Sequence, residues 1–124
     1  MGKKQVAMGI VIRSGKILLV KRPQEFKWNI PGFKVNGEAP EDTVVNKIKK
    51  DTGIEIELKD FIDVLNTENV DVFWYLCSYN GGMIESKSDV QWIDIKNIRD
   101  FVSEDALKVY PNEVLRYLGL KLQI

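Results

Sequence analysis

The chain has 124 residues, of which 18 are basic and 18 are acidic, so its formal net charge is zero. This length predicts one domain over residues 1–124, and the balanced charge excludes a general attraction to nucleic acid or to an anionic membrane surface. The chain contains no histidine. This excludes histidine-based triads, histidine general bases and histidine metal sites.

Cysteine content and hydropathy bear on the compartment. Cys77 is the only cysteine, and it lies in an apolar run. A lone cysteine of this kind is typical of a reducing compartment, and we expect its thiol to be buried and unreactive. No apolar run reaches the ~20 residues of a membrane span, and the first residues lead into a strand pattern rather than a signal peptide. We therefore expect a cytoplasmic protein without a membrane partner.

A β-hairpin is predicted at the start of the chain. Residues 5–13 are apolar on both faces, which is typical of a central strand that is covered on both sides. Residues 16–22 form a second strand after a turn at 14–15, and residues 23–27 form a loop. Gly9 has no side chain, which predicts the close approach of a core helix.

A glycine-rich turn and a helix follow, over residues 31–53. Pro40 suits the first helical position because its φ is already helical and its missing N–H is not needed there. Two acidic residues come next, where negative charge stabilises the positive end of the helix dipole. Residues at three- and four-residue spacings predict one buried side, formed by Val44, Val45, Ile48 and Thr52. Gly53 is expected to end the helix in a left-handed conformation.

The next segment is rich in strand patterns. Residues 54–58 alternate strictly between apolar and polar, which predicts a half-buried strand. A turn at residues 59–60 and a short strand at 61–65 are expected after it. Residues 70–79 have the strongest strand pattern, and their alternation places apolar side chains on both faces.

Turns and helices are predicted for the remainder. Residues 80–82 (Asn-Gly-Gly) predict a tight turn, followed by a return strand that starts at 83–85, and a polar loop at 86–89 precedes a last strand at 90–95. The last third is helical, with one turn at 97–101, a helix at 106–110 capped at Ser103, and a helix at 112–118 ended by Gly119. Helices in the middle and at the end of a strand-rich chain predict an α/β fold with a mixed sheet covered on both faces.

The stretch from Gly32 to Ile54 resembles the signature of the Nudix hydrolases, a MutT-like family. That signature is Gly, five residues, Glu, seven residues, then Arg-Glu-hydrophobic-any-Glu-Glu-any-Gly-hydrophobic. Five residues fall on their positions without a gap: Gly32, Glu38, Ile48, Gly53 and Ile54. The preceding Trp-Asn-Ile-Pro-Gly also resembles the entry to this motif. The resemblance implies a single-domain Nudix-type α/β/α sandwich with a mixed sheet, and Mg²⁺-dependent hydrolysis of nucleoside diphosphate-linked compounds.

The chain departs from the signature where the family's chemistry lies. Residues 46–51 read Asn-Lys-Ile-Lys-Lys-Asp. Two of the three carboxylates with which the family holds Mg²⁺ are thus replaced by Lys47 and Lys50, and only Asp51 keeps an acid. A lysine ammonium about 6 Å from a divalent cation repels it by roughly 5 kcal/mol at an effective dielectric near 20. We expect a degenerate Nudix box that has lost the usual metal site.

The resemblance and the departures together define candidate site residues. The catalytic candidates are Glu38 and Asp51, and the weak metal candidates are Glu38, Asp51 and Glu85. The ligand-binding candidates are Gly32, Phe33, Lys34, Lys47 and Lys50. Two interpretations of the helix lysines stay open. They either form a solvated face on which Lys47 pairs with Asp51, or they bind a diphosphate directly without metal. Trp28, Trp74 and Tyr75 are either core residues or platforms for a nucleobase, and the core is favoured.

Two functions follow as hypotheses. The first is a ligand-binding or regulatory protein for nucleotide-like small molecules that needs no cofactor. The alternative is an active hydrolase that holds Mg²⁺ with a non-standard set of ligands. That set would be drawn from Glu38, Asp51, Glu41 or Asp42, and Glu85 or Asp89. The family's frequent dimers also imply a homodimer.

Overall fold

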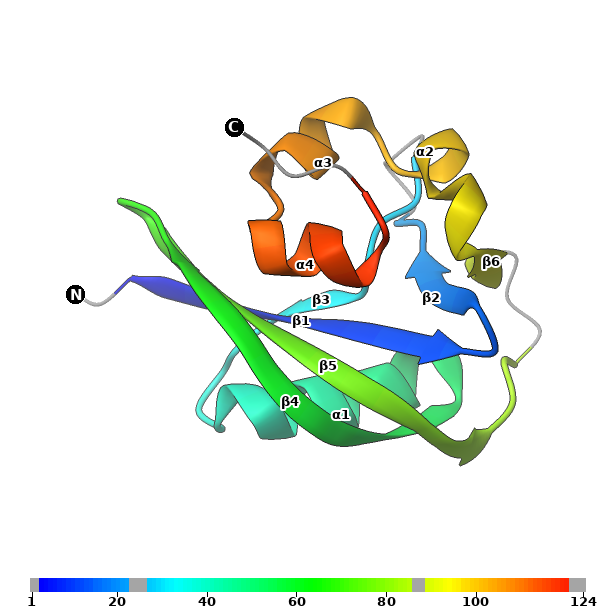
Figure 1. The fold of residues 1–124 in the computed structure, drawn as a ribbon. Coiled ribbons are helices and arrows are strands. Elements are labelled where there is room, and N and C mark those ends of the chain that lie inside the picture. Colours follow the sequence, from blue (N-terminus) through cyan, green and yellow to red (C-terminus); the bar gives the residue numbers. More distant parts are fainter. Residues whose placement is uncertain (1–2, 23–26, 86–88, 121–124) are drawn as a thin grey trace.

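A mixed sheet lies between helices on its two faces (Figure 1). The computed structural model describes residues 3–22, 27–85 and 89–120. The strands of this part of the chain are β1 (Lys4–Arg13), β2 (Lys16–Val20), β3 (Gly32–Lys34), β4 (Ile54–Asn66), β5 (Val70–Gly82) and β6 (Val90–Asp94). Its helices are α1 (Pro40–Thr52), η1 (Ile95–Asn97), α2 (Ile98–Phe101), α3 (Glu104–Val109) and α4 (Asn112–Tyr117).

The strand order is β4-β5-β1-β2-β6, and β3 pairs with the start of β1. β1 and β5 run parallel, whereas the other paired strands are antiparallel. The predicted hairpin of β1 and β2 is confirmed, with Ile12 opposite Ile17. Helix α1 covers one face, and α2, α3 and α4 cover the other (Figure 1). The predicted α/β/α architecture with a mixed sheet is therefore confirmed.

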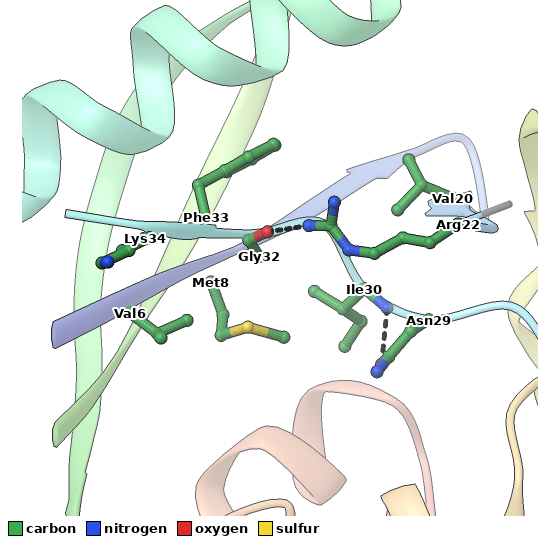
Figure 2. A pocket seen from close by; sticks show the side chains of 9 residues that line it. All are labelled: Val6, Met8, Val20, Arg22, Asn29, Ile30, Gly32, Phe33 and Lys34. Carbon is green, nitrogen blue, oxygen red and sulfur yellow. Dashed lines mark hydrogen bonds between the residues drawn. The ribbon is translucent and has the colours of Figure 1, made fainter. Parts of the chain in front are cut away.

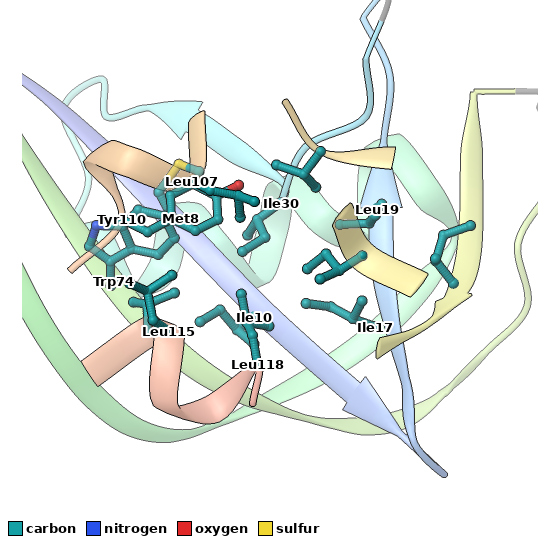
Figure 3. Packing of buried hydrophobic residues seen from close by; sticks show 14 residues of the cluster. Met8, Ile10, Ile17, Leu19, Ile30, Trp74, Leu107, Tyr110, Leu115 and Leu118 are labelled. Atoms are coloured by element: carbon teal, nitrogen blue, oxygen red, sulfur yellow. The ribbon is translucent and has the colours of Figure 1, made fainter. Parts of the chain in front are cut away.

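Two hydrophobic cores lie on opposite faces of the sheet. The predicted alternation along β5 is confirmed, because Trp74 packs with the C-terminal helices and Cys77 packs on the α1 side. Figure 3 shows Trp74 and Tyr110 close together, and their rings meet edge to face with centroids 5.0 Å apart. Gly9 allows α1 to approach, because a Cβ there would lie 2.8 Å from Ile48 Cδ1.

Helix α1 has the termini that its sequence predicts. Pro40 is its first residue, and Ala39 gives no side-chain cap. At the other end Gly53 adopts φ 85°, and its backbone N–H donates to the Lys49 carbonyl at 2.9 Å. The Thr52 hydroxyl is buried, donates to the Ile48 carbonyl at 2.6 Å and accepts from the Ile54 N–H at 3.0 Å. These bonds connect α1 directly to β4.

The turn predicted at residues 59–60 is wrong. β4 runs without a break from Ile54 to Asn66, and its register with β5 shifts between Leu58 and Asp60. A β-bulge adds an unpaired residue to one strand without ending the ladder. The polar pair Lys59 and Asp60 is thus accommodated in a bulge rather than in a turn.

The tight turn predicted at residues 80–82 is also wrong, as is the return strand at 83–85. Gly81 and Gly82 belong to β5 and pair with Glu55 and Ile54 of β4. A Cβ on Gly82 would lie 2.2 Å from the Gly53 carbonyl oxygen. Its lack of a side chain therefore serves a close backbone approach, and residues 83–85 follow without strand structure.

The C-terminal helices agree with the sequence in kind and place. Ser103 caps α3, since its hydroxyl accepts from the Ala106 N–H at 3.1 Å. α4 is followed by Gly119 with φ 69°. Within the described ranges, no helix is both long and apolar enough to cross a membrane. Most of the loop predicted at 23–27 and of that at 86–89 lies outside the described residues.

Candidate functional site

A cavity of about 310 Å³ lies beside β3 (Figure 2). The ligand-binding candidates Gly32, Phe33 and Lys34 all line it. Its other lining residues are Val6, Met8, Val20, Arg22, Asn29 and Ile30. In Figure 2 Phe33 points toward α1, whereas Val6 and Met8 point to the opposite side. Gly32 stands opposite Met8 in the ladder, and its missing side chain leaves room for the Met8 thioether.

Arg22 brings a fixed positive charge to this cavity. Its guanidinium donates a hydrogen bond to the Gly32 carbonyl (Figure 2). A guanidinium has five N–H donors, and among the described residues this is the one hydrogen bond that Arg22 makes, so further donors are available for an anion. Lys34, which is exposed, adds a second cation at the same cavity.

Asn29 is held in one orientation at the wall. Its Oδ1 accepts from the Ile30 N–H at 2.8 Å and from the Tyr110 hydroxyl. The Ile30 N–H is always a donor, so the amide oxygen must face it and Nδ2 is the group that Asn29 can offer to a ligand. Burial raises the pKa of Tyr110, which keeps its hydroxyl protonated as a donor.

A second cavity, of about 220 Å³, adjoins the first. The two share Val20, Arg22 and Phe33. The second is also lined by Lys21, Val90 and two carboxylates, Asp51 and Asp89. The catalytic candidate Asp51, from the end of α1, therefore lies beside the ligand-binding candidate Phe33.

Lys47, Lys50 and Asp51 share one face of α1, three and four residues apart. Lys47 is half-buried and Lys50 is exposed. Neither lines the cavities described above. Lys49, which lies between them in the sequence, pairs with Glu55 at 3.6 Å.

Glu38 is engaged at the start of α1. Its carboxylate accepts from the Thr43 hydroxyl at 3.1 Å and from the Asn46 amide at 3.5 Å. Glu85 is exposed, and its backbone N–H approaches the Thr52 carbonyl at 3.4 Å. Glu41 lines a separate cavity and accepts from the Tyr75 hydroxyl. Within the described residues, no three His, Cys, Asp or Glu side chains are grouped so that they could hold a metal ion.

The geometry can be compared with known proteins. A family model described as NUDIX domain matches residues 3–113. The chain belongs to the Nudix family. Its helix α1 carries signature positions 46–52, and β3 carries the glycine that begins the signature.

Relatives and solved structures agree with this assignment. This Nudix chain is 28% identical over 114 residues to a MutT-like protein of Streptomyces ambofaciens, over 86% of this chain and 71% of the relative. A MutT structure from work on Aliivibrio salmonicida and Vibrio cholerae matches with a TM-score of 0.75 and 19% identity, over 94% of this chain and 97% of that one. An ADP-ribose pyrophosphatase from Streptococcus suis matches with a TM-score of 0.67 and 22% identity, over 77% and 76%.

Three residues at these cavities, Lys21, Arg22 and Asn29, lie outside the Nudix signature. The basic pair Lys21 and Arg22 directly follows a buried strand, and this position is the one signal that could have indicated them. Asn29 carried no such signal, because its orientation depends on Tyr110, 81 residues away in the chain. The Nudix signature alone therefore gave an incomplete list of the residues at these cavities.

Proposed function

We propose that this Nudix protein binds nucleoside diphosphate-linked ligands and has lost, or largely lost, the family's Mg²⁺-dependent pyrophosphohydrolase activity. The charge on the signature face of α1 carries the proposal, because Lys47 and Lys50 stand where the family has acidic metal ligands. The cavities beside β3 can still hold a ligand, whereas the face of α1 carries lysines in place of acids. This combination supports a ligand-binding or regulatory role.

The residues present do not fit Mg²⁺. This ion prefers a near-octahedral set of oxygen ligands and is usually held by carboxylates together with substrate phosphates. Asp51 is the one acid retained among the three positions on the helix face, and Glu38 is already bonded to Thr43 and Asn46. The two lysines would add repulsion of several kcal/mol to a divalent cation, as estimated above. The box is therefore proposed to be degenerate.

The residues that line the two cavities favour an anionic ligand. Lys21, Arg22 and Lys34 line the two adjoining cavities, where Asp51 and Asp89 are the acids. Arg22 is oriented by the Gly32 carbonyl, which suits it to bind phosphate oxygens. Volumes of about 310 and 220 Å³ give room for a nucleotide-sized molecule, and Asn29 can donate to an acceptor on it. The similarity to an ADP-ribose pyrophosphatase makes ADP-ribose a suitable probe.

The test is ligand binding without metal. In EDTA, ADP-ribose or ADP is expected to raise the melting temperature, and the shift should shrink between 50 and 300 mM salt, at about the concentrations where screening grows strong. If Lys47 and Lys50 bind the diphosphate, Lys47→Ala combined with Lys50→Ala should abolish the shift. Lys49→Ala is the matched control on the same helix, since Lys49 pairs with Glu55 instead.

Other outcomes discriminate between the interpretations. A shift that persists in the double variant but disappears in Arg22→Ala would assign the anion to the cavity cations and leave the helix lysines as a solvated face. The alternative, an active hydrolase with non-standard metal ligands, requires Mg²⁺-dependent turnover of ADP-ribose or nucleoside triphosphates. Such turnover, lost in Asp51→Asn, would overturn the proposed loss of activity.

A further inference from the structure

A third cavity, of about 550 Å³, lies between the first turn of α1 and the middle of the β4–β5 hairpin. Its lining residues are Glu41, Leu58, Lys59, Asp60, Phe61, Phe73 and Tyr75. None of them lines the two cavities of the candidate site. The volume is within the range of small-molecule sites in proteins, so this cavity could hold a ligand of its own.

Three aromatic rings and Leu58 form the apolar part of this cavity. Phe61 is 49% exposed, although it belongs to a strand and packs edge to face on Tyr75 with ring centroids 5.5 Å apart. The register of β4 shifts both before and after Phe61. Bulges change the direction in which a side chain points, and they often occur next to binding sites. Phe73 and Tyr75 of β5 complete an aromatic wall.

Two carboxylates border the same wall. The Tyr75 hydroxyl donates to Glu41 Oε2 at 3.3 Å, so Glu41 is held against the aromatic residues. Burial, and then the Glu41 charge, raises the pKa of Tyr75 to about 12 and keeps this donor protonated. Asp60 lies at the bulge. Ionised carboxylates accept hydrogen bonds but donate none, so both residues select a ligand that donates.

Two features of the cavity act against a positive ligand. Lys59 contributes one ammonium, but it is exposed and its long stem lets the charge move into solvent. The amino end of α1 carries a partial positive charge, which Glu41 and Asp42 of the first turn offset. Two acids, of which Glu41 is held by Tyr75, and three aromatic rings therefore outweigh one mobile base.

We propose that this third cavity binds an organic cation, namely an ammonium group carried on an apolar or aromatic body. The ammonium lies between Glu41 and Asp60, and the body packs on Phe61, Phe73 and Tyr75. Ring faces carry negative potential and attract cations, which adds to the carboxylate attraction. The site is separate from the nucleotide-like site and does not depend on its occupancy.

Phenethylamine is a suitable probe, since it joins one ammonium to one ring. Titration of the whole chain, followed by ¹⁵N–¹H correlation spectra and by calorimetry, should show saturable binding with a dissociation constant on the order of 1 mM. The shifted resonances should centre on residues 58–61 and 73–75. The neutral 2-phenylethanol and the anionic 3-phenylpropionate should bind at least about tenfold more weakly, because they lack the cation.

Variants separate charge from packing. Glu41→Gln and Asp60→Asn should each weaken phenethylamine binding several-fold and remove its preference over 2-phenylethanol. Glu41→Gln keeps an acceptor for the Tyr75 hydroxyl, so the wall stays intact. Phe61→Ala should weaken the amine and the alcohol alike. Asp42→Asn is the matched control, since Asp42 is an exposed acid in the same helical turn that does not line the cavity.

The proposal is overturned if 2-phenylethanol binds as well as phenethylamine, or if Asp42→Asn weakens binding as much as Glu41→Gln. It is also overturned if phenethylamine at 10 mM, about ten times the expected constant, leaves residues 58–61 and 73–75 unshifted. Analytical ultracentrifugation tests whether a second copy of the chain covers the aromatic wall. A dimer that Phe61→Ala dissociates would show that a second copy covers this wall, and the cation site would be withdrawn.

Discussion

Burial determines the ionisation of the single thiol. Cys77 is 2% exposed on the α1 side of β5, and burial raises its pKa from the ordinary 9.0 to about 12. A thiol in this state is neutral at physiological pH, and a neutral thiol is neither a nucleophile nor a metal ligand. The expectation of a buried thiol is therefore confirmed.

The first prediction concerns this thiol. Cys77 should resist iodoacetamide at pH 8 in the folded protein and react readily in denaturant. Because the thiol pKa is higher in the folded state, its contribution to stability is present below pH 9 and is lost as pH rises from 9 toward 12. At pH 10 the loss should be on the order of 1 kcal/mol. Between pH 8 and pH 10, the melting temperature of Cys77→Val should decrease less than that of the unmodified protein. An equal decrease in the two proteins would contradict the raised pKa of the Cys77 thiol.

Close packing between secondary-structure elements depends on glycine at two contacts. Gly9 of β1 faces α1, and Gly82 of β5 lies against the backbone of Gly53, at the end of α1. A strand pattern with glycine near its end is easily mistaken for a turn, because the contact that requires the glycine comes from residues far away in sequence. This explains the wrong turn prediction at residues 80–82.

Gly82→Ala is the second prediction. The new Cβ would meet the Gly53 carbonyl, and φ 83° is unfavourable for alanine, so we expect a loss of about 2 to 4 kcal/mol in the free energy of unfolding. Gly15→Ala is the matched control, because Gly15 has φ 76° but no atom within 4 Å of the new Cβ. That variant should lose only about 1 kcal/mol. Urea denaturation measures both, and equal losses would mean that the contact is unimportant.

Across the whole molecule, the buried side of α1 joins this helix to the core of the Nudix fold. Helix α1 packs through Val44 and Ile48, which are buried in the core, whereas Lys47 is half-buried and Lys50 is exposed. We therefore propose that the fold tolerates lysine at these signature positions, whereas the family's function does not. Under this proposal Asn46 has a structural role, because its side-chain amide donates a hydrogen bond to the Glu38 carboxylate.

The third prediction rebuilds the signature. Asn46→Arg, Lys47→Glu, Lys50→Glu and Asp51→Glu together should create Mg²⁺ binding that calorimetry detects at millimolar metal, since the repulsion becomes attraction. Hydrolysis should return weakly or not at all, because the substrate must also be positioned against the metal. Lys4→Glu with Lys96→Glu gives a similar change of net charge away from α1 and should bind no metal. If the fourfold variant does not bind Mg²⁺, the face of α1 that carries these positions does not border the ligand pocket.

Local patterns in the sequence determined much of this protein. They were sufficient for the family, the α/β class, both ends of α1 and the two buried faces of β5. They also located Gly32, Phe33, Lys34 and Asp51, which line the two adjoining cavities. Such features are set by residues within one helix or strand, or by a motif of fixed spacing, so a linear sequence contains them.

Contacts between distant segments decided the remainder. Arg22 and Asn29 meet at one cavity because β2 and β3 converge there, and Asn29 is oriented by Tyr110. The continuity of β4 through its bulges depends on pairing with β5, and the aromatic wall beside Glu41 forms only when this hairpin lies against α1. Side chains from separate elements become neighbours through sheet pairing and packing, whose partners no local sequence pattern specifies.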